Sequence, residues 1–371
     1  MTNRFEESIS HQSITLLSRL LLTPEVGGDS HPSMMAEMKR DALSIGREEF
    51  DNLLSLASSN HVIVRGLVVF RDMMREAEDA IRAEWAQTAL VAEQLRITTA
   101  LYFLEDICTE FEDKKYDVTV IKSLDHWPDL GGDLDLYTNA ASEDVITLMK
   151  RRFDAQLAPR SWGDRLAGKW NFVIAGLPEA VEIHMGCLGQ TGEQAGIAAR
   201  VVEGSRRVVI GRHVFRVPSA SDRLMISTLQ RMYRHFYFRL CDIVDTVALS
   251  ASGGIDYFDL RSSATSAGIW EGVATYLTIV SDYSRGYGGS GLDSPQFVLE
   301  AARFGGDEVY FAKDFLRIPI VPQSAQLYGE QLAGMLRRRE LQNGARLSLL
   351  PWLATAALVG QRITGTDKGI W

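Results

Sequence analysis

The amino-acid sequence predicts an α+β protein, in which a small mixed β-sheet is flanked by N-terminal and C-terminal helical domains. Alternating apolar and polar residues, the pattern of half-buried strands, are concentrated in the middle of the chain. Helical periodicity fills much of the chain before and after them. At 371 residues, the chain exceeds the length that one hydrophobic core usually serves. We therefore expect three parts: a helical region over 1–112, an α/β core over 113–217 and a helical domain over 218–371.

The first hundred residues are predicted to be helical. Apolar residues recur with a helical period over 10–22 and again over 47–56, on either side of a Gly/Pro/Ser-rich break at 24–32. Residues 73–112 are predicted to form one or two long helices with a continuous apolar stripe. His61 lies between Asn60 and Val62 with no recognisable catalytic or metal-binding motif around it, so we expect it to be structural or exposed to solvent.

The central stretch contains two strand patterns separated by a turn. The first covers 118–121 and breaks at Lys122 and Ser123 into a segment rich in glycine and proline. The second holds Asp133 and Asp135 on one face, because successive side chains of a strand alternate between its faces. The two-residue rise separates these carboxylates by about 7 Å, close enough for both to reach a shared cation. A divalent metal ion is the expected occupant.

Two further elements are predicted after this strand pair. Residues 142–157 carry an N-cap serine, an early acidic pair and an apolar stripe, which predict an amphipathic helix. Residues 170–174 and 180–185 are predicted to form a hairpin. Glu182 and His184 share one face of its second arm, and the apolar residues Val181, Ile183 and Met185 share the other.

The order of a strand, a serine-containing turn and an Asp-x-Asp strand resembles the nucleotidyltransferase superfamily, which includes polymerase β, poly(A) polymerases and aminoglycoside nucleotidyltransferases. The resemblance covers about 118–185 and is nearest to divergent branches without an assigned acceptor. In that superfamily a Gly-Ser pair ends one strand and Asp-x-Asp lies on the next, and Ser123 and Asp133 stand at this spacing. Lys122 stands where the superfamily usually has glycine and could supply charge to a triphosphate instead.

The resemblance implies transfer of a nucleoside monophosphate from a nucleoside triphosphate to a small-molecule or protein acceptor, with release of pyrophosphate. Asp133, Asp135 and Glu182 would be the catalytic residues and would hold two Mg²⁺ ions, for which Mn²⁺ could substitute. The resemblance does not identify the acceptor or the preferred base. The expected nucleotide-binding residues are Lys122, Ser123, His184, Arg231 and Arg234.

The two arginines come from the C-terminal region. The sequence predicts one helix over 222–249, after a start signal at Pro218 and the serines that follow it. Arg231 and Arg234 share a face of this helix with His235, because residues three and four apart are neighbours on a helix surface. Arginine suits phosphate groups geometrically. Salt bridges to acidic residues such as Asp242 are an equally favoured interpretation.

The rest of the C-terminal region is predicted to be largely helical. Helices are expected over 294–304, 323–342 and 347–362. The glycine-rich segment 285–292 lacks the spacing of a phosphate-binding loop and is predicted to be a mobile loop or lid. The longest apolar run, 347–360, is shorter than the roughly twenty residues that span a bilayer, so we expect a buried helix and no membrane contact.

Composition limits the partners and the compartment. The formal net charge of −9 opposes a broad phosphate-binding surface, so long nucleic acid is not expected as a substrate. The three cysteines lack metal-ligand spacing, and the polar, acidic N-terminus does not resemble a secretory signal. Both observations favour the cytoplasm.

Three other functions compete with nucleotidyl transfer. A metal-dependent sugar transferase also uses Asp-x-Asp, although its motif usually ends a strongly hydrophobic strand, whereas here the hydrophobic alternation follows the pair. A catalytically degenerate protein that binds a nucleotide or a partner is left open by Lys122. A calcium loop is disfavoured because glycine is missing at its sixth position and glutamate at its twelfth.

Overall fold

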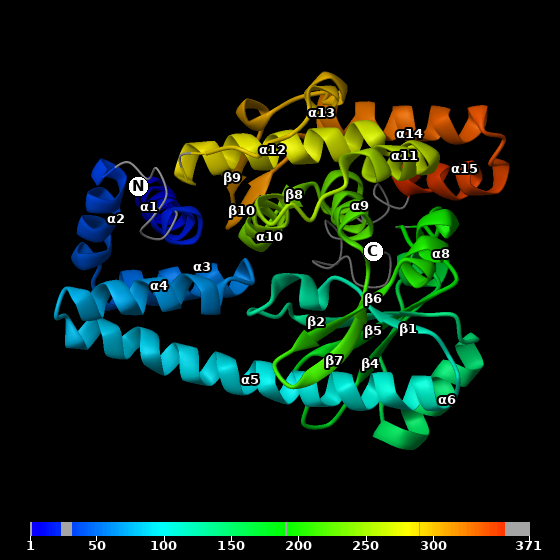
Figure 1. The fold of residues 1–371 in the computed structure, drawn as a ribbon, viewed down its shortest axis with the longest axis horizontal. Coiled ribbons are helices and arrows are strands. Elements are labelled where there is room, and N and C mark those ends of the chain that lie inside the picture. The colour runs from blue at the N-terminus through cyan, green and yellow to red at the C-terminus, as the bar shows by residue number, and fades with distance from the viewer. Residues whose placement is uncertain (1, 24–31, 190, 289, 353–371) are drawn as a thin grey trace.

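The computed structural model describes residues 2–23, 32–189, 191–288 and 290–352. The predicted fold class is confirmed: the protein is α+β, with a small mixed sheet and helices on both sides of it (Figure 1). The α-helices are α1 (Thr2–Leu22), α2 (Pro32–Ser44), α3 (Arg47–Ser59), α4 (Ile63–Glu76), α5 (Ala80–Asp113), α6 (Ser142–Phe153), α7 (Trp162–Leu166), α8 (Ala195–Glu203), α9 (Ala220–Gln230), α10 (Leu240–Ala251), α11 (Tyr257–Ala267), α12 (Trp270–Gly288), α13 (Gln296–Ala301), α14 (Ala325–Arg337) and α15 (Leu341–Ser348). The strands are β1 (Val118–Val120), β2 (Asp133–Thr138), β3 (Gln156–Leu157), β4 (Lys169–Val173), β5 (Ala180–Met185), β6 (Arg206–Ile210), β7 (His213–Val217), β8 (Tyr237–Phe238), β9 (Tyr310–Ala312) and β10 (Phe315–Arg317).

The main sheet has the strand order β1-β2-β5-β4-β3. β1 pairs with β2 and β4 pairs with β5 in antiparallel fashion, so the predicted hairpin is confirmed. β2 and β5 are parallel neighbours, and their register places Asp135 beside Glu182. Leu134, Leu136 and Ile183 alternate with these polar residues and are fully buried. Burial of one face therefore fixes the register, because a one-residue slip would move these apolar side chains to the face that carries the acids.

The N-terminal region is helical, as predicted, but α2 and residues 63–72 of α4 lie outside the ranges where helical periodicity was predicted. The expected long helical stretch over 73–112 is the end of α4 followed by α5, and Asp79 caps α5 by accepting a hydrogen bond from the Arg82 N–H. α2 was not predicted from the sequence. It begins at Pro32, a residue suited to the first turn of a helix. Most of the predicted break at 24–32 lies outside the described residues.

The N-terminal and C-terminal helices pack against each other. α1 lies against α10 and α12 (Figure 1), and the Ser18 hydroxyl is 2.7 Å from the hydroxyl of Tyr283. One continuous hydrophobic core includes buried residues of both helical regions and of the sheet.

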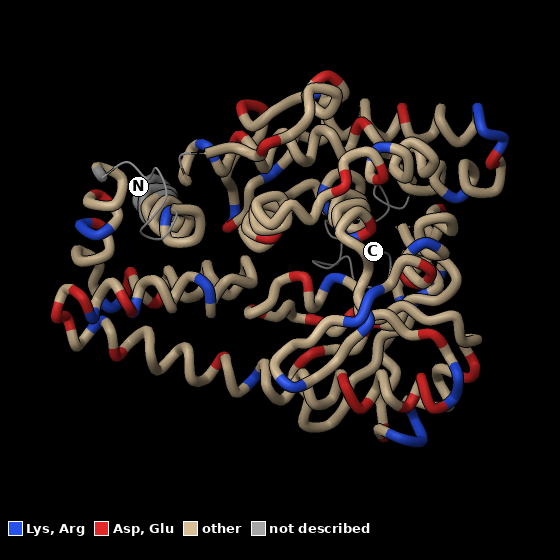
Figure 2. The backbone as a smooth tube through the Cα atoms, in the orientation of Figure 1, with Lys and Arg blue, Asp and Glu red and all other residues tan. Residues whose placement is uncertain are grey.

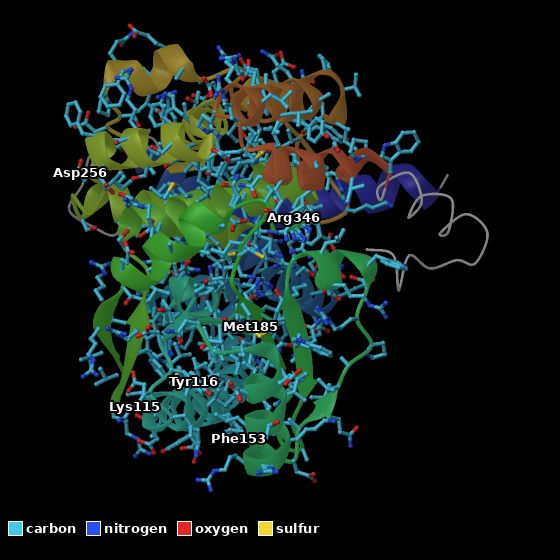
Figure 3. The ribbon with its side chains drawn as sticks, turned by 90° about the vertical axis from the view of Figure 1, so that its right-hand side faces the viewer. Lys115, Tyr116, Phe153, Met185, Asp256 and Arg346 are labelled. Atoms are coloured by element: carbon cyan, nitrogen blue, oxygen red, sulfur yellow. The ribbon has the colours of Figure 1, made fainter. Side chains whose placement is uncertain are left out.

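In the view turned by 90° (Figure 3), Met185 at the end of β5 lies between Phe153 of α6 and Arg346 of α15. The C-terminal end of β5 therefore faces the C-terminal helices.

The predicted single helix over 222–249 is wrong. α9 ends at Gln230 and is followed by a wide helical turn, Arg231–His235, and then by β8 and α10. Phe236 adopts a left-handed conformation, with φ of 55°, that ends the helix. β8 pairs with β10 from a distant part of the chain. Tertiary pairing therefore overrides the helical periodicity of this segment.

Two other helix boundaries also differ from the prediction. Ser142 is the first residue of α6 and not its N-cap, and its hydroxyl accepts a hydrogen bond of 2.6 Å from the Trp170 indole N–H. α6 ends at Phe153, so the end of the predicted helix over 142–157 is β3. At the start of α9, Ser219 caps the helix by accepting a hydrogen bond from the Asp222 N–H. The start signal after Pro218 is therefore confirmed.

The later C-terminal helices are shorter than predicted. α13 and α14 lie within the predicted ranges 294–304 and 323–342, and α15 occupies 341–348. Most of the predicted helix over 347–362, and of the apolar run over 347–360, lies outside the described residues. The first four residues of the glycine-rich segment 285–292 are the last turn of α12 and not a loop. In the described part of the chain, no helix is long and apolar enough to cross a membrane.

Candidate active site

A cavity of about 220 Å³ lies where the N-terminal halves of β2 and β5 meet the wide turn after α9. Along the described backbone as a whole, acidic and basic residues are interspersed (Figure 2). Three groups of residues line the cavity. The carboxylate wall is Lys122, Ser123, Asp133, Asp135, Lys169 and Glu182; the arginine wall is Gln230, Arg231, Arg234, His235, Tyr237 and Arg239; the histidine side is His61, His126, Gly131 and Gly132.

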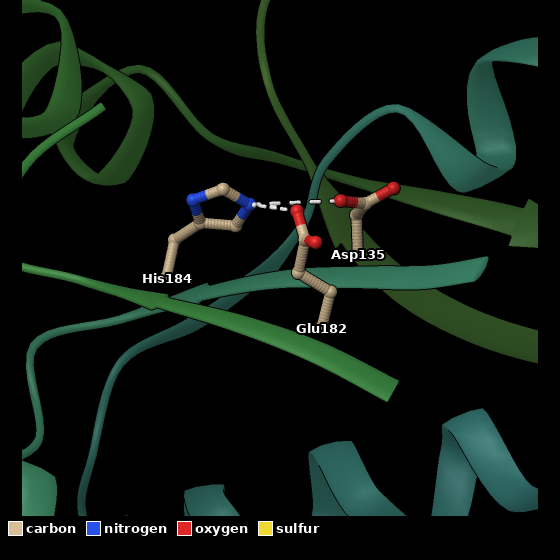
Figure 4. Close-up of side chains that lie close together, drawn as sticks. All are labelled: Asp135, Glu182 and His184. Atoms are coloured by element: carbon tan, nitrogen blue, oxygen red, sulfur yellow. Dashed lines mark hydrogen bonds and ion pairs between the residues drawn. The ribbon is translucent and has the colours of Figure 1, made fainter. Parts of the chain in front are cut away.

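The carboxylate wall follows from the pairing of β2 with β5. The parallel register sets Asp135 beside Glu182, and His184 lies two residues further along β5 on the same face. One ligand atom from each of these three side chains lies within 4.8 Å of the other two (Figure 4). Asp133 lines the same cavity from the exposed start of β2. All three predicted carboxylates therefore line one cavity, but the closest group contains His184 in place of Asp133.

Two lysines form ion pairs with Asp135 and Glu182. The Lys122 ammonium group forms an ion pair with Asp135 and lies 3.5 Å from Glu182 Oε1. Lys169 Nζ lies 2.6 Å from Glu182 Oε2. His184 Nε2 is 2.8 Å from Glu182 Oε1, so both oxygens of this carboxylate have partners. Burial opposes ionisation of Glu182, but Lys122, His184 and Lys169 outweigh it and hold the pKa of Glu182 well below its ordinary value.

Asp133 is in a different electrostatic environment. Desolvation, followed by repulsion from the charges of Asp135 and Glu182, raises the pKa of Asp133 to about 6. The positive charge of Lys122 lowers this pKa, but its effect is smaller. No cation lies within ion-pair distance of its carboxylate among the described residues. A divalent cation at this position would relieve the repulsion between the three acidic groups.

The backbone is strained at Lys122, in the turn between β1 and β2. Lys122 has φ of 62° and ψ of −58°, and the N–H of Ser123 donates a hydrogen bond of 2.6 Å to the carbonyl oxygen of Ile121. This is a γ-turn with positive φ, which is rare for a residue other than glycine. Strain of this kind persists where the surrounding structure enforces it, and it clusters at functional sites. Lys122 thus adopts a backbone conformation suited to the glycine that the superfamily usually has here.

The side chain of Ser123 forms hydrogen bonds with the backbone of β2. Its buried hydroxyl donates a hydrogen bond of 3.0 Å to the Asp133 carbonyl oxygen and accepts one of 2.7 Å from the Asp135 N–H. These bonds fix the main chain on both sides of Leu134. The side chain of Ser123 therefore contacts the backbone of β2, and that of Lys122 contacts Asp135 of β2 and Glu182 of β5, whereas contact of either residue with phosphates stays a prediction.

The arginine wall contains one paired and two unpaired guanidinium groups. Arg231 is buried, and its Nε lies 2.7 Å from Asp242 Oδ2, which is the salt bridge that the sequence left open. Arg234 and Arg239 are partly exposed and have no carboxylate within 4.0 Å in the described part of the chain. The guanidinium group of Arg239 instead lies over the rings of Tyr237 and Phe315. Arg239 was not identified from the sequence, because its place in the wall depends on the chain reversal at Phe236. Two guanidinium groups without a carboxylate partner suit an anionic ligand.

Two stacked histidines form the third side of the cavity. The rings of His61 and His126 are 5.9 Å apart and nearly parallel, at 17°. His61 adopts φ of 54°, and Gly132 packs against its ring. Burial and then the positive charges of Arg239 and His126 lower the pKa of His61 to about 2, which keeps its imidazole neutral. The sequence carried no local signal for this placement, because His61 lies far along the chain from every other cavity residue.

A buried charge network supports His126. Its Nδ1 is 2.5 Å from Asp245, which also accepts a hydrogen bond of 2.6 Å from Arg65. Arg65 donates a second hydrogen bond, of 2.8 Å, to Asp129. His126 is therefore held within the protein, whereas the adjacent Trp127 is 40% exposed.

The donor set of the carboxylate wall fits a divalent metal ion. Asp135 Oδ1 is buried and is paired with the Lys122 ammonium group, so the position already binds a cation. Carboxylate oxygens suit Mg²⁺ and Mn²⁺, and an added imidazole also suits Mn²⁺ and later transition ions.

No family model matches the chain, and no curated protein matches it. The function is therefore inferred from the cavity.

Proposed function

We propose that the protein is a metal-dependent nucleotidyltransferase that moves a nucleoside monophosphate from a nucleoside triphosphate to an acceptor. One observation carries the proposal: Asp133, Asp135 and Glu182 line the same cavity as the unpaired guanidinium groups of Arg234 and Arg239. The acids provide a cation site, and the arginines provide an anion site beside it. A triphosphate bound to a divalent metal carries both complementary charges.

Each side chain then has a role in one displacement. Asp133, Asp135 and Glu182 would hold Mg²⁺ or Mn²⁺, which neutralises charge on the phosphates. Arg234 and Arg239 bind the phosphate oxygens. An acceptor oxygen forms a bond to the α-phosphorus, the bond between the α-phosphorus and its bridging oxygen to the β-phosphorus breaks, and pyrophosphate leaves.

A second candidate function is nucleotide binding without catalysis. It is favoured by the ammonium group of Lys122, which lies between Asp135 and Glu182 where a cation would otherwise bind. If Lys122 stays in place when a nucleotide enters, the carboxylate wall is already neutralised and no metal-assisted displacement follows. In that case no small-molecule or protein acceptor is modified, and a partner would instead bind the nucleotide-bound form of the protein.

Product analysis with the full-length protein separates these functions. Each of the four nucleoside triphosphates is incubated with Mg²⁺ or Mn²⁺, and pyrophosphate is measured with water or a cell extract as the source of acceptor. Pyrophosphate that disappears in Asp135→Asn supports nucleotidyl transfer. Thermal stabilisation by a triphosphate without any pyrophosphate supports the binding protein. Release of a nucleoside diphosphate from a nucleotide sugar, with no pyrophosphate from any triphosphate, supports a sugar transferase and contradicts the proposal.

A further inference from the structure

The geometry points to a transition-metal position formed by Asp135, Glu182 and His184, in which the imidazole is a direct ligand and Mn²⁺ or a later divalent transition ion is bound in preference to Mg²⁺. The inference deepens the proposed function, because it names the metal class of the same cavity. It assigns His184 a role different from the nucleotide contact predicted from the sequence.

The three ligand atoms face one another across two paired strands. His184 Nε2 lies 2.8 Å from Glu182 Oε1 and 3.6 Å from Asp135 Oδ1 (Figure 4). An ion bonded at about 2.0–2.2 Å to three ligands requires ligand atoms roughly 3 Å or more apart. The Asp135–His184 spacing already meets this requirement, and the Glu182–His184 contact meets it after a small side-chain rotation.

The position is buried and holds a protein cation. Asp135 is 8% exposed and His184 is 4% exposed, so an ion bound between them would be largely shielded from solvent. Asp135 Oδ1 is paired with the Lys122 ammonium group, while His184 Nε2 is directed toward both carboxylates (Figure 4). The group therefore already binds one cation, and its imidazole nitrogen is directed at the same place.

The Lys122 ammonium group is the internal competitor of the metal. It contacts Asp135 and approaches Glu182, so it supplies the positive charge that the two carboxylates need when no ion is bound. Lysine has a flexible stem, and its ammonium group can leave this position by rotation of the side chain. A triphosphate on the arginine wall would offer it a new partner, so metal and nucleotide binding are expected to favour each other.

Ligand chemistry sets the preference for the metal. Mg²⁺ favours oxygen ligands in near-octahedral geometry and retains its water molecules, whereas imidazole binds Mn²⁺ and later transition ions more readily. A site with two carboxylates and one buried imidazole therefore discriminates against Mg²⁺. The discrimination depends on His184, because the two carboxylates alone suit either ion.

Electron paramagnetic resonance of Mn²⁺ added alone to the full-length protein tests this assignment. We expect bound Mn²⁺ with a nitrogen modulation from a directly coordinated imidazole. In His184→Gln, the modulation disappears, Mn²⁺ affinity falls at least tenfold, and the ratio of Mn²⁺ to Mg²⁺ affinity falls toward that of an all-oxygen site. His213→Gln is the matched control, because His213 pairs with Glu105 outside the cavity and its loss leaves the spectrum unchanged.

The wild-type spectrum decides the question even if His184→Gln does not fold. Bound Mn²⁺ without nitrogen modulation, or equal affinity for Mg²⁺ and Mn²⁺, overturns the assignment. Absence of Mn²⁺ binding in both the wild type and Lys122→Met, which lacks the competing ammonium group, also overturns it. No nucleotide is present, so a failure of the metal position is distinguishable from a failure to release pyrophosphate.

Discussion

The hydroxyl of Ser123 accepts a hydrogen bond of 2.7 Å from the main-chain N–H of Asp135. The same hydroxyl donates to the Asp133 carbonyl oxygen, so one buried side chain fixes the strand segment that carries both acids. The serine of the predicted Gly-Ser-like turn therefore has a structural role that is independent of any phosphate.

Ser123→Ala is expected to lower the free energy of unfolding by about 1–3 kcal/mol, because it leaves the buried N–H of Asp135 without an acceptor. Chemical denaturation of the metal-free protein measures the change. Ser123→Thr retains a hydroxyl and is the comparison variant, although its added methyl group must fit a closely packed position. Equal stability of Ser123→Ala and the wild type would show that water or a shifted strand replaces these bonds.

Neutralising the two aspartates should affect stability in opposite directions. Asp133→Asn removes a charge repelled by Asp135 and Glu182, so we expect the metal-free protein to gain stability, by no more than about 1 kcal/mol because the side chain is exposed. Asp135→Asn deprives the Lys122 ammonium of its nearest carboxylate and should be destabilising. Thermal unfolding without metal compares the two variants. Both should lose pyrophosphate release, since each removes a proposed metal ligand.

The stability gain of Asp133→Asn should depend on pH. The folded-state pKa of Asp133, about 6, lies above its ordinary value of 3.8. Between these values the folded protein binds more protons than the unfolded chain, so this residue makes stability fall as pH rises. The difference between Asp133→Asn and the wild type should therefore grow from about pH 4 to pH 6 and then level off. A difference that is constant over this range would contradict the proposed repulsion.

Arg231 and Arg234 should respond differently to replacement by methionine. Arg231→Met leaves Asp242 buried without its partner, so a loss of about 3–5 kcal/mol in unfolding free energy is expected. Arg234 has no ion pair in the described part of the chain, so Arg234→Met should barely change stability and should weaken triphosphate binding about tenfold. Denaturation and calorimetric titration with a triphosphate measure the two effects. Unchanged triphosphate affinity in Arg234→Met would remove the arginine wall from the proposed binding site.

Lys122→Gly should be more stable than Lys122→Met by about 1 kcal/mol. Both variants lose the ammonium group, but only glycine adopts the positive φ of this turn without strain. Both should bind Mn²⁺ more tightly than the wild type when no nucleotide is present, because the competing cation is gone. Denaturation compares the stabilities, and Mn²⁺ titration compares the affinities. Greater stability of Lys122→Met would mean that the turn relaxes when its side chain is shortened.

The parts of the fold that were predicted correctly depend on local patterns. The alternation over 133–138 and 180–185 reflects burial of one strand face, and this pattern suffices to place Asp135 and Glu182 on polar faces. The parallel pairing of their strands was not predicted, since the resemblance implied only that Glu182 belongs to the same site. The Ser219 cap was equally local. These features needed no knowledge of distant contacts.

The missed features depend on distant contacts. His61 and Arg239 reach the cavity only through the packing of the helices on the sheet. The break in the predicted helix over 222–249 comes from the pairing of β8 with β10. The aromatic run over 236–238 is a strand-type signal that could have indicated this break. Lys169 was likewise overlooked, because its ion pair with Glu182 crosses from β4 to β5.

The bonds of Arg65 to Asp129 and Asp245 have a mechanical consequence. They join α4, the turn before β2 and α10, which are three segments far apart in the chain. Pulling any one of them away would leave buried charges uncompensated, at a cost of several kcal/mol. The histidine side of the cavity therefore behaves as a rigid frame rather than a hinge.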